Sequence, residues 1–299
     1  MQTGPGAEVP LVVDGGMSNA LEDRGHDLST ALWTAAVLRT APDEVAAVHR
    51  DYFRAGASVA TTASYQASVP GLVAAGVDRS EAEDLIRAGV RIARAVRDDL
   101  ADDDETRLVA ASVGPYGAAL ADGSEYRGRY GVSAGRLRDF HLPRLELLAS
   151  AEPDLFAVET IPDVEEAEVL VPLLDEVGLP AWFSYSVTEG RTRAGQPLEE
   201  AFAVAASGSA VLAVGVNCCA PDDVLDAVRL ATQVTGLPAV AYPNSGEGWD
   251  SGTHTWSGHA SYDVSLAPSW VAAGARYVGG CCRVGPSDIA ALAGVLRDS

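Results

Sequence analysis

The chain of 299 residues contains no lysine, because all 21 of its basic residues are arginines. This absence excludes mechanisms that need a lysine Schiff base, a lysine general base or the lysine of a phosphate-binding loop. Acidic residues number 42, which gives a formal net charge of -21. A surface of that sign does not neutralise phosphates, so we expect neither a nucleic-acid partner nor an anionic membrane partner. The acidity is typical of a soluble protein, and it also favours cationic ligands.

Long apolar runs and a nucleotide-binding loop are missing as well. No segment approaches the ~18 apolar residues of a membrane span, and the opening MQTGPGAEVP lacks a charged and then apolar leader. We therefore expect a cytoplasmic protein. The run from Asp14 to Met17 (DGGM) lacks the three-glycine spacing of a dinucleotide-binding fingerprint.

Short apolar runs rich in β-branched residues alternate with helix-like segments, which is the rhythm of βα units. Ser80 to Glu83 and Asp163 to Glu166 both have the spacing of a capping box ahead of an apolar stripe. Eight strands are expected, at Leu11 to Asp14, Ser58 to Thr62, Leu108 to Val113, Leu155 to Glu159, Ala181 to Ser186, Val211 to Asn217, Ala239 to Tyr242 and Ala275 to Gly279. This pattern predicts an α/β fold, a (β/α)8 TIM-type barrel that takes up residues 1–299 as a single domain with no separate second domain.

In such a barrel the functional groups stand where strands end and βα loops begin. Polar residues occupy most of these points: Asp14, Ser64, Tyr65, Glu159, Ser184, Ser186, Asn217, Asn244 and Ser245. The four cysteines fall at two strand ends as adjacent pairs, Cys218-Cys219 directly after Asn217 and Cys281-Cys282 after the eighth strand. Thiols that converge from two strand ends indicate metal ligands or redox groups rather than a disulfide scaffold.

Adjacent cysteines in a regular strand point to opposite faces and cannot both bind one ion. We expect Gly279-Gly280 to turn the backbone sharply before Cys281-Cys282, which removes that objection. Cys218 directly follows a strand, whereas Cys219 is expected to point toward the next helix as a small buried residue. Three thiolates leave one position open, as in catalytic zinc sites, and soft ligands favour zinc or copper(I) over magnesium or calcium.

At this point the motifs resemble the homocysteine S-methyltransferase family, close to its S-methylmethionine-dependent branch. The resemblance runs in family order over nearly the whole chain: LVVDGGMSNALEDRG, DYFRAGASVATTASYQAS, SVGPYGAALADGSEYRGRYG, ETIP, GVNC, YPNSGE and GGCCR. It implies a Zn²⁺ cofactor held by the cysteine of GVNC and both cysteines of GGCC, which are Cys218, Cys281 and Cys282 here and would serve catalysis through the metal. It also implies that Asp14 and Glu159 contact the amino acid substrate, as charge pairing with its ammonium predicts.

The resemblance implies transfer of a methyl group from a sulfonium donor, S-methylmethionine or S-adenosylmethionine, to the thiol of L-homocysteine, with methionine as the product. The leaving group is a neutral thioether, so no general acid is required. Gly15 and Asn217 complete the expected substrate site, and the Asn217 amide either binds substrate or holds the metal loop. Cys219 departs from the family motif and is a candidate for oxidative inactivation.

Three alternatives stay open: a selenocysteine or other thiol acceptor, a non-catalytic protein in which all four cysteines close a structural zinc site, and a redox protein with vicinal disulfides. The loop GEGWDSGTHTWSGH adds two pairs of residues. Trp249 and Trp256 are candidates for receiving the donor's cation. His254 and His259 are expected to be lid or surface residues.

Overall fold

The computed structural model describes residues 9–28, 34–101, 105–250 and 255–298. Within them, eight parallel strands form one sheet in the order β1-β12-β9-β8-β5-β4-β3-β2. Val13 and Val59 pair as a parallel bridge between the two outer strands, which closes the sheet into a barrel. The strands are β1 (Leu11–Val12), β2 (Val59–Thr61), β3 (Leu108–Val113), β4 (Leu155–Ile161), β5 (Ala181–Tyr185), β8 (Val211–Asn217), β9 (Ala239–Tyr242) and β12 (Ala275–Val278). Each falls where the sequence predicts a strand, and the TIM-type barrel is confirmed.

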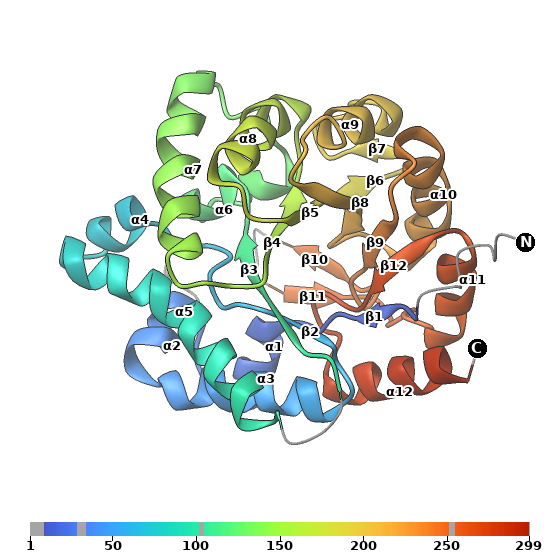
Figure 1. The fold of residues 1–299 in the computed structure, drawn as a ribbon, viewed down its shortest axis with the longest axis horizontal. Helices are drawn as coiled ribbons and strands as arrows, with labels where there is room; N and C mark the ends of the chain where they lie inside the picture. The colour runs from blue at the N-terminus through green and yellow to red at the C-terminus, as the bar shows by residue number, and fades with distance from the viewer. Residues whose placement is uncertain (1–8, 29–33, 102–104, 251–254, 299) are drawn as a thin grey trace, which may run out of the picture.

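Helices surround the strands and separate them from solvent (Figure 1). Those between β1 and β4 are α1 (Met17–Asp23), α2 (Thr34–Thr40), α3 (Pro42–Arg54), α4 (Val69–Ala74), α5 (Arg79–Asp99), α6 (Tyr116–Leu120), η1 (Ser124–Tyr126) and α7 (Ala134–Ala149). Those after β4 are α8 (Val164–Val177), α9 (Leu198–Ala205), η2 (Pro221–Asp223), α10 (Val224–Thr235), η3 (Val264–Leu266), α11 (Ala267–Ala272) and α12 (Pro286–Arg297).

Local capping explains where two of the predicted helices begin. Asp163 caps α8 as expected, because its side chain accepts a hydrogen bond from the amide two residues further on. The other expected cap is wrong: Asp78, not Ser80, caps α5, and its carboxylate accepts from the Ser80 amide at 2.8 Å. A carboxylate can accept from both the amide and the hydroxyl of Ser80, so it satisfies the free helix terminus better than the serine would.

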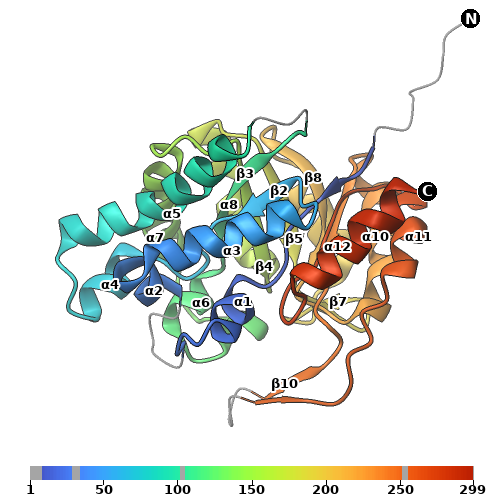
Figure 2. The ribbon, with the colours of Figure 1, turned by 90° about the horizontal axis from the view of Figure 1, so that it is seen from below.

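Two small antiparallel hairpins are added outside the barrel. One pairs β6 (Val187–Thr188) with β7 (Arg191–Thr192), and the other pairs β10 (Gly248–Asp250) with β11 (Thr255–Ser257). Figure 2 shows β10 extending away from the body of the barrel. His259 follows this hairpin and is exposed. His254 and the side chains of Trp249 and Trp256 lie outside the described residues, so the lid and cation-binding roles expected of them stay predictions.

None of the helices in the described part of the chain combines the length and apolar character that a bilayer crossing demands.

The two-residue repeat of the strands decides which side chains fill the barrel. One buried apolar cluster occupies the interior, and its members from β3, β4, β5, β8 and β9 are Ala110, Leu155, Ala157, Trp182, Ala213, Val240 and Tyr242. Because alternate side chains share a face, the same inward rows continue to the carboxyl ends of the strands as Ser112, Glu159, Ser184 and Asn217. The barrel interior therefore changes from apolar to polar at the face where function is expected.

Candidate metal and substrate site

Three cysteine sulfurs meet at the polar end of the barrel. The Sγ atoms of Cys218, Cys281 and Cys282 all lie within 4.8 Å of one another, and those of Cys218 and Cys282 are 3.8 Å apart. Tetrahedral zinc with Zn–S bonds of about 2.3 Å needs sulfurs roughly 3.8 Å apart. The cluster could therefore hold a metal ion, and its spacing and soft ligands fit zinc.

The backbone at the end of β8 explains how two successive residues reach the same space. Asn217 faces inward in the regular pattern of the strand, so Cys218 would be expected to face outward. Cys218 instead has φ of 48°, in the left-handed region. This conformation is uncommon for a non-glycine residue, and it returns the thiol to the mouth of the barrel, where Tyr126 Oη lies 3.3 Å from its sulfur.

Gly279 and Gly280 precede the second cysteine pair, but they act differently from the expected sharp turn. Neither has a positive φ. A Cβ on Gly279 would lie 2.5 Å from the Val13 carbonyl oxygen, and one on Gly280 would lie 2.1 Å from the Val284 side chain. Glycine is needed here because two backbone segments approach closely. Two hydrogen bonds then hold the loop that carries the cysteines. Cys281 N donates to the Pro243 carbonyl, and Cys282 N donates to Asn244 Oδ1.

The fourth cysteine is separate from the other three. Cys219 is almost fully buried in the apolar layer between the barrel and its helices, and burial raises the pKa of its thiol. The three clustered thiols behave as a group: hydrogen bonds from Cys281 and Cys282 lower the pKa of Cys218. All four cysteines are free thiols in this structure.

Glu159 stands at the centre of a buried polar layer. Ser112 Oγ donates a short hydrogen bond to Glu159 Oε1, and Tyr242 Oη donates to Oε2 at 3.0 Å. Burial raises the pKa of Glu159 to about 7. The charge of Arg144 lowers this pKa but does not outweigh burial, and the donors that contact the carboxylate are the neutral hydroxyls of Ser112 and Tyr242. The carboxylate therefore gains from a positively charged ligand.

Asn217 and Thr160 hold the backbone around Glu159. Asn217 Oδ1 accepts from Thr160 N at 2.6 Å and from Ser184 Oγ at 2.8 Å, while Nδ2 donates to Thr160 Oγ1 at 2.8 Å. Thr160 has φ of 61°, a strained conformation for a β-branched residue. Most of the Asn217 amide is thus engaged within the protein, and Nδ2 also lies 4.0 Å from Cys281 Sγ. These contacts favour the loop-holding role of Asn217 over substrate binding.

Asp14 lies at the same mouth, just after the end of β1. Both of its carboxylate oxygens accept hydrogen bonds from Thr61, from the amide at 2.8 Å and from Oγ1 at 2.7 Å. Burial raises the pKa of Asp14, and the nearby Glu159 charge adds to this. Gly15 is pressed against the loop after β12, where a Cβ would lie 2.2 Å from the Val284 carbonyl oxygen.

A cavity joins these groups. Asp14, Gly15, Glu159 and the three clustered cysteines all line it, together with Glu125, Tyr65, Tyr126 and Tyr242. Among the described residues that line it, the ionisable groups are carboxyls, thiols and phenols, and no arginine is present. Of the residues predicted to bind metal or substrate, Asn217 does not line the cavity. It instead forms hydrogen bonds with Thr160, which does. The site therefore offers thiols for a metal and carboxylates for cations.

Sequence reasoning missed four of the lining or supporting side chains. Tyr242 and Ser112 occupy inward positions of the two-residue repeat, so extending the strand pattern by one step would have found them. Glu125 and Tyr126 lie on η1, in a loop without periodicity, and no local signal marks them.

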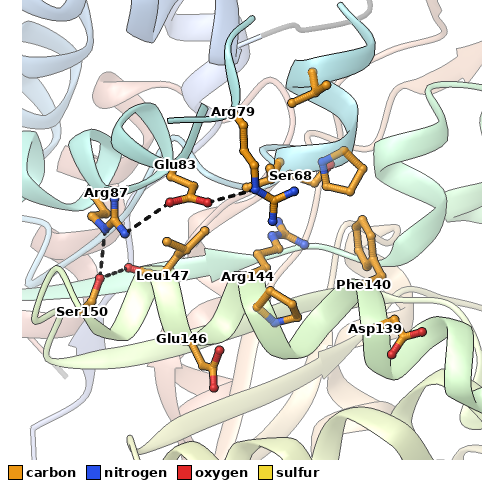
Figure 3. Close-up of a pocket in the computed structure, with 14 residues that line it drawn as sticks. Ser68, Arg79, Glu83, Arg87, Asp139, Phe140, Arg144, Glu146, Leu147 and Ser150 are labelled. Carbon is orange, nitrogen blue, oxygen red and sulfur yellow. Dashed lines mark hydrogen bonds and ion pairs between the residues drawn. The ribbon is translucent and has the colours of Figure 1, made fainter. Parts of the chain in front are cut away.

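A second cavity lies outside the barrel mouth, between α4, α5 and α7 (Figure 3). Ion pairs join Arg79 and Arg87 to Glu83 on its wall, and Arg87 Nε also donates to Ser150 Oγ. Arg144 also lines this cavity, but it is 3% exposed, and its guanidinium serves the barrel.

Arg144 donates hydrogen bonds to three backbone carbonyls at the ends of β2 and β3, those of Ser64, Tyr65 and Gly114. Replacing it with methionine leaves these buried acceptors unpaired. We expect Arg144→Met to lower the free energy of unfolding by about 3–5 kcal/mol, as measured by urea denaturation. Arg87→Met, on the same cavity wall, should change it by less than about 1 kcal/mol. A loss below about 1 kcal/mol for Arg144→Met would show that the guanidinium does not support the mouth.

The fold and the site together define a class, a (β/α)8 barrel with an open three-thiol cluster at the carboxyl ends of its strands. Comparison with known proteins agrees. The model of the homocysteine S-methyltransferase family matches residues 11–296. The chain therefore belongs to the homocysteine S-methyltransferase family, a family of enzymes.

Individual relatives extend over nearly the full chain. The homocysteine S-methyltransferase of Escherichia coli is 46% identical over 290 residues, which cover 94% of each protein. The selenocysteine Se-methyltransferase of Brassica oleracea is 40% identical and covers 94% of this chain and 87% of its own. The metallated form of the homocysteine methyltransferase MmuM from Escherichia coli superposes with a TM-score of 0.87 at 42% identity and covers 96% of both chains.

Proposed function

We propose that this protein transfers a methyl group from a sulfonium donor, S-methylmethionine or else S-adenosylmethionine, to the thiol of L-homocysteine and so forms methionine. The observation that carries the proposal is the convergence of three thiols and two buried carboxylates on one cavity. The substrates are small molecules, in keeping with the names of the relatives.

Zn²⁺ is the metal we propose for Cys218, Cys281 and Cys282. The fit rests on the 3.8 Å separation between two of the sulfurs and on the all-thiol ligand set. When bound, zinc supplies a Lewis acid that lowers the pKa of an incoming thiol and so provides a nucleophile at neutral pH. Three protein thiols leave a position for that substrate group.

The protein's own side chains would bind and orient homocysteine. Asp14 and Glu159 would receive its α-ammonium, because both carboxylates are buried and, among the described residues, accept hydrogen bonds only from neutral donors. Ser112 and Tyr242 fix the Glu159 carboxylate through one hydrogen bond on each oxygen. Gly15 lines the same cavity, and its lack of a side chain lets the loop after β12 pack closely against it.

The methyl transfer needs no acid or base from the protein's side chains. The thiolate sulfur forms a bond to the methyl carbon while the bond from that carbon to the donor sulfur breaks, and the electron pair stays on a neutral thioether. No proton is delivered to the leaving group, so the described lining residues need no general acid. Catalysis then depends on aligning the two sulfurs and excluding water from a buried site.

Selenocysteine is a second candidate acceptor, because one relative bears the name of a selenocysteine Se-methyltransferase. A closed four-cysteine structural site is disfavoured by the burial of Cys219 in the outer apolar layer. The test is methionine formation by zinc-loaded protein with homocysteine and each donor in turn, and with selenocysteine in parallel. We expect methionine with S-methylmethionine and none after the metal is removed with a chelator. No methionine with either donor would refute the proposal.

A further inference from the structure

A third carboxylate, that of Glu125, lies in the cavity and has one oxygen without a hydrogen-bond partner among the described residues. Glu125 is 5% exposed and lines the cavity with Asp14 and Glu159. The other two carboxylates accept hydrogen bonds from Thr61, Ser112 or Tyr242. By contrast, Glu125 Oε2 is buried without a hydrogen-bond partner among the described residues. An unpaired buried carboxylate is costly, so its position calls for a ligand that completes it.

The loop that carries Glu125 is fixed at both ends. Tyr116 N, before the loop, donates to Glu166 Oε1 at 2.6 Å, and Tyr130 Oη, after it, donates to Glu166 Oε2 at 3.0 Å. His141 holds the same Glu166 carboxylate at 2.8 Å. A buried set of hydrogen bonds therefore fixes both ends of the loop that places Glu125 in the cavity wall.

Glu125 also lies beside the thiol cluster. The next residue, Tyr126, has its hydroxyl 3.3 Å from Cys218 Sγ, and the Glu125 charge acts on the buried phenol of Tyr65. The charged groups that act on Glu125 are Cys218 and Asp122, and both are negative when ionised. A carboxylate set among aromatic rings, with only negative neighbours, suits a cation.

The positive charges of the two substrates can be compared with the carboxylates that line the cavity. Homocysteine brings one ammonium, for which Asp14 and Glu159 are already placed under the proposed function. A sulfonium amino acid brings two positive charges of its own, and no other carboxylate among the described residues lines the cavity. We propose that Glu125 binds the sulfonium charge of the methyl donor, and so determines that the enzyme takes a sulfonium rather than a neutral thioether. This inference rests on the proposed function.

The test compares two variants by steady-state kinetics of the zinc-loaded protein. Glu125→Gln keeps the shape and removes the charge, and we expect it to raise the KM for S-methylmethionine roughly 10- to 100-fold. The KM for homocysteine should stay within about threefold, because Asp14 and Glu159 are intact. Glu125→Asp, which keeps the charge, should recover part of the loss. Glu199→Gln, an exposed carboxylate on α9, is the matched control and should leave both KM values unchanged.

A purely structural role for Glu125 would give a different result. It would lower the Tm of Glu125→Gln and raise both KM values together, and either result overturns the proposal. We expect a Tm at or above that of the wild type, since removing an unpaired buried charge stabilises the protein.

Calorimetric titration of S-methylmethionine without homocysteine separates this inference from the proposed function, because it requires no turnover. Weaker binding by Glu125→Gln than by the wild type supports the inference even if no methionine forms, whereas equal binding refutes it even if the enzyme is active.

Discussion

Replacing Cys281 with serine is expected to remove bound zinc and methyl transfer together. Structural zinc sites with four ligands bind the ion with about 10–16 kcal/mol in total. An even share of about 3–4 kcal/mol for each ligand means that the loss of one thiolate should weaken zinc binding by roughly two to three orders of magnitude. The serine hydroxyl does not replace it, because it stays protonated at neutral pH. Metal content after dialysis and the rate of methionine formation are the two measurements.

Cys219→Ser is the matched control for that experiment. Cys219 is the sequence neighbour of a proposed ligand, yet it lies in the outer apolar layer. The variant should retain zinc and activity and lose only about 1–2 kcal/mol of stability from a buried hydroxyl. Loss of metal in Cys219→Ser, or retention of metal in Cys281→Ser, would show that the ligand set is wrong.

Replacing Glu159 with glutamine is expected to have opposite effects on function and stability. The variant should raise the KM for homocysteine roughly 100-fold, because the ammonium loses a charged partner in a buried site. It should also make the protein without substrate more stable at pH 8 by about 3 kcal/mol. The reason is linkage: burial raises the pKa of Glu159 from its ordinary 4.5 to about 7, so between these two pH values only the folded wild type holds the proton. At pH 8 the carboxylate is ionised in both states, and the folded wild type bears the full cost of the buried charge.

The sign of that effect can be checked by pH. Below pH 4.5 the carboxyl is protonated in both states and the wild type pays no penalty, so the two proteins should then be equally stable. Between pH 4.5 and 7 the wild type should lose stability relative to Glu159→Gln, and above pH 7 the difference should stay constant. Urea denaturation at pH 4, 6 and 8 measures it. A Glu159→Gln variant that is less stable than the wild type at pH 8 would contradict this explanation.

Much of the site follows from strand periodicity, which the sequence carries. The eight β-branched runs place Asp14, Glu159 and both cysteine pairs at strand ends, and parallel strands of a barrel end on one face. The convergence of thiols separated by more than sixty positions was therefore predictable. The outward position of Cys219 was predicted on a different ground, because Cys219 stands just before the next helix.

The remaining features depend on backbone conformations and long-range contacts that no local pattern encodes. Cys218 and Thr160 adopt left-handed conformations that sequence statistics disfavour, and tertiary hydrogen bonds hold them there. The role of Gly279-Gly280 was misassigned, since close approach to another strand cannot be seen from one segment. Glu125 enters the cavity from an irregular loop. Hydrogen bonds from residues on both sides of that loop to Glu166, on α8, fix its position.

The central claim is that this cavity brings a sulfonium methyl group directly to the sulfur of homocysteine. The most direct measurement uses homocysteine labelled in its carbon skeleton and S-methylmethionine labelled in both methyl groups, with the products resolved by mass spectrometry. The account predicts two methionines for each homocysteine consumed, one of which carries both the skeleton label and one donor methyl. Skeleton-labelled methionine without the donor methyl, or labelled homocysteine left unchanged by zinc-loaded protein, would contradict it.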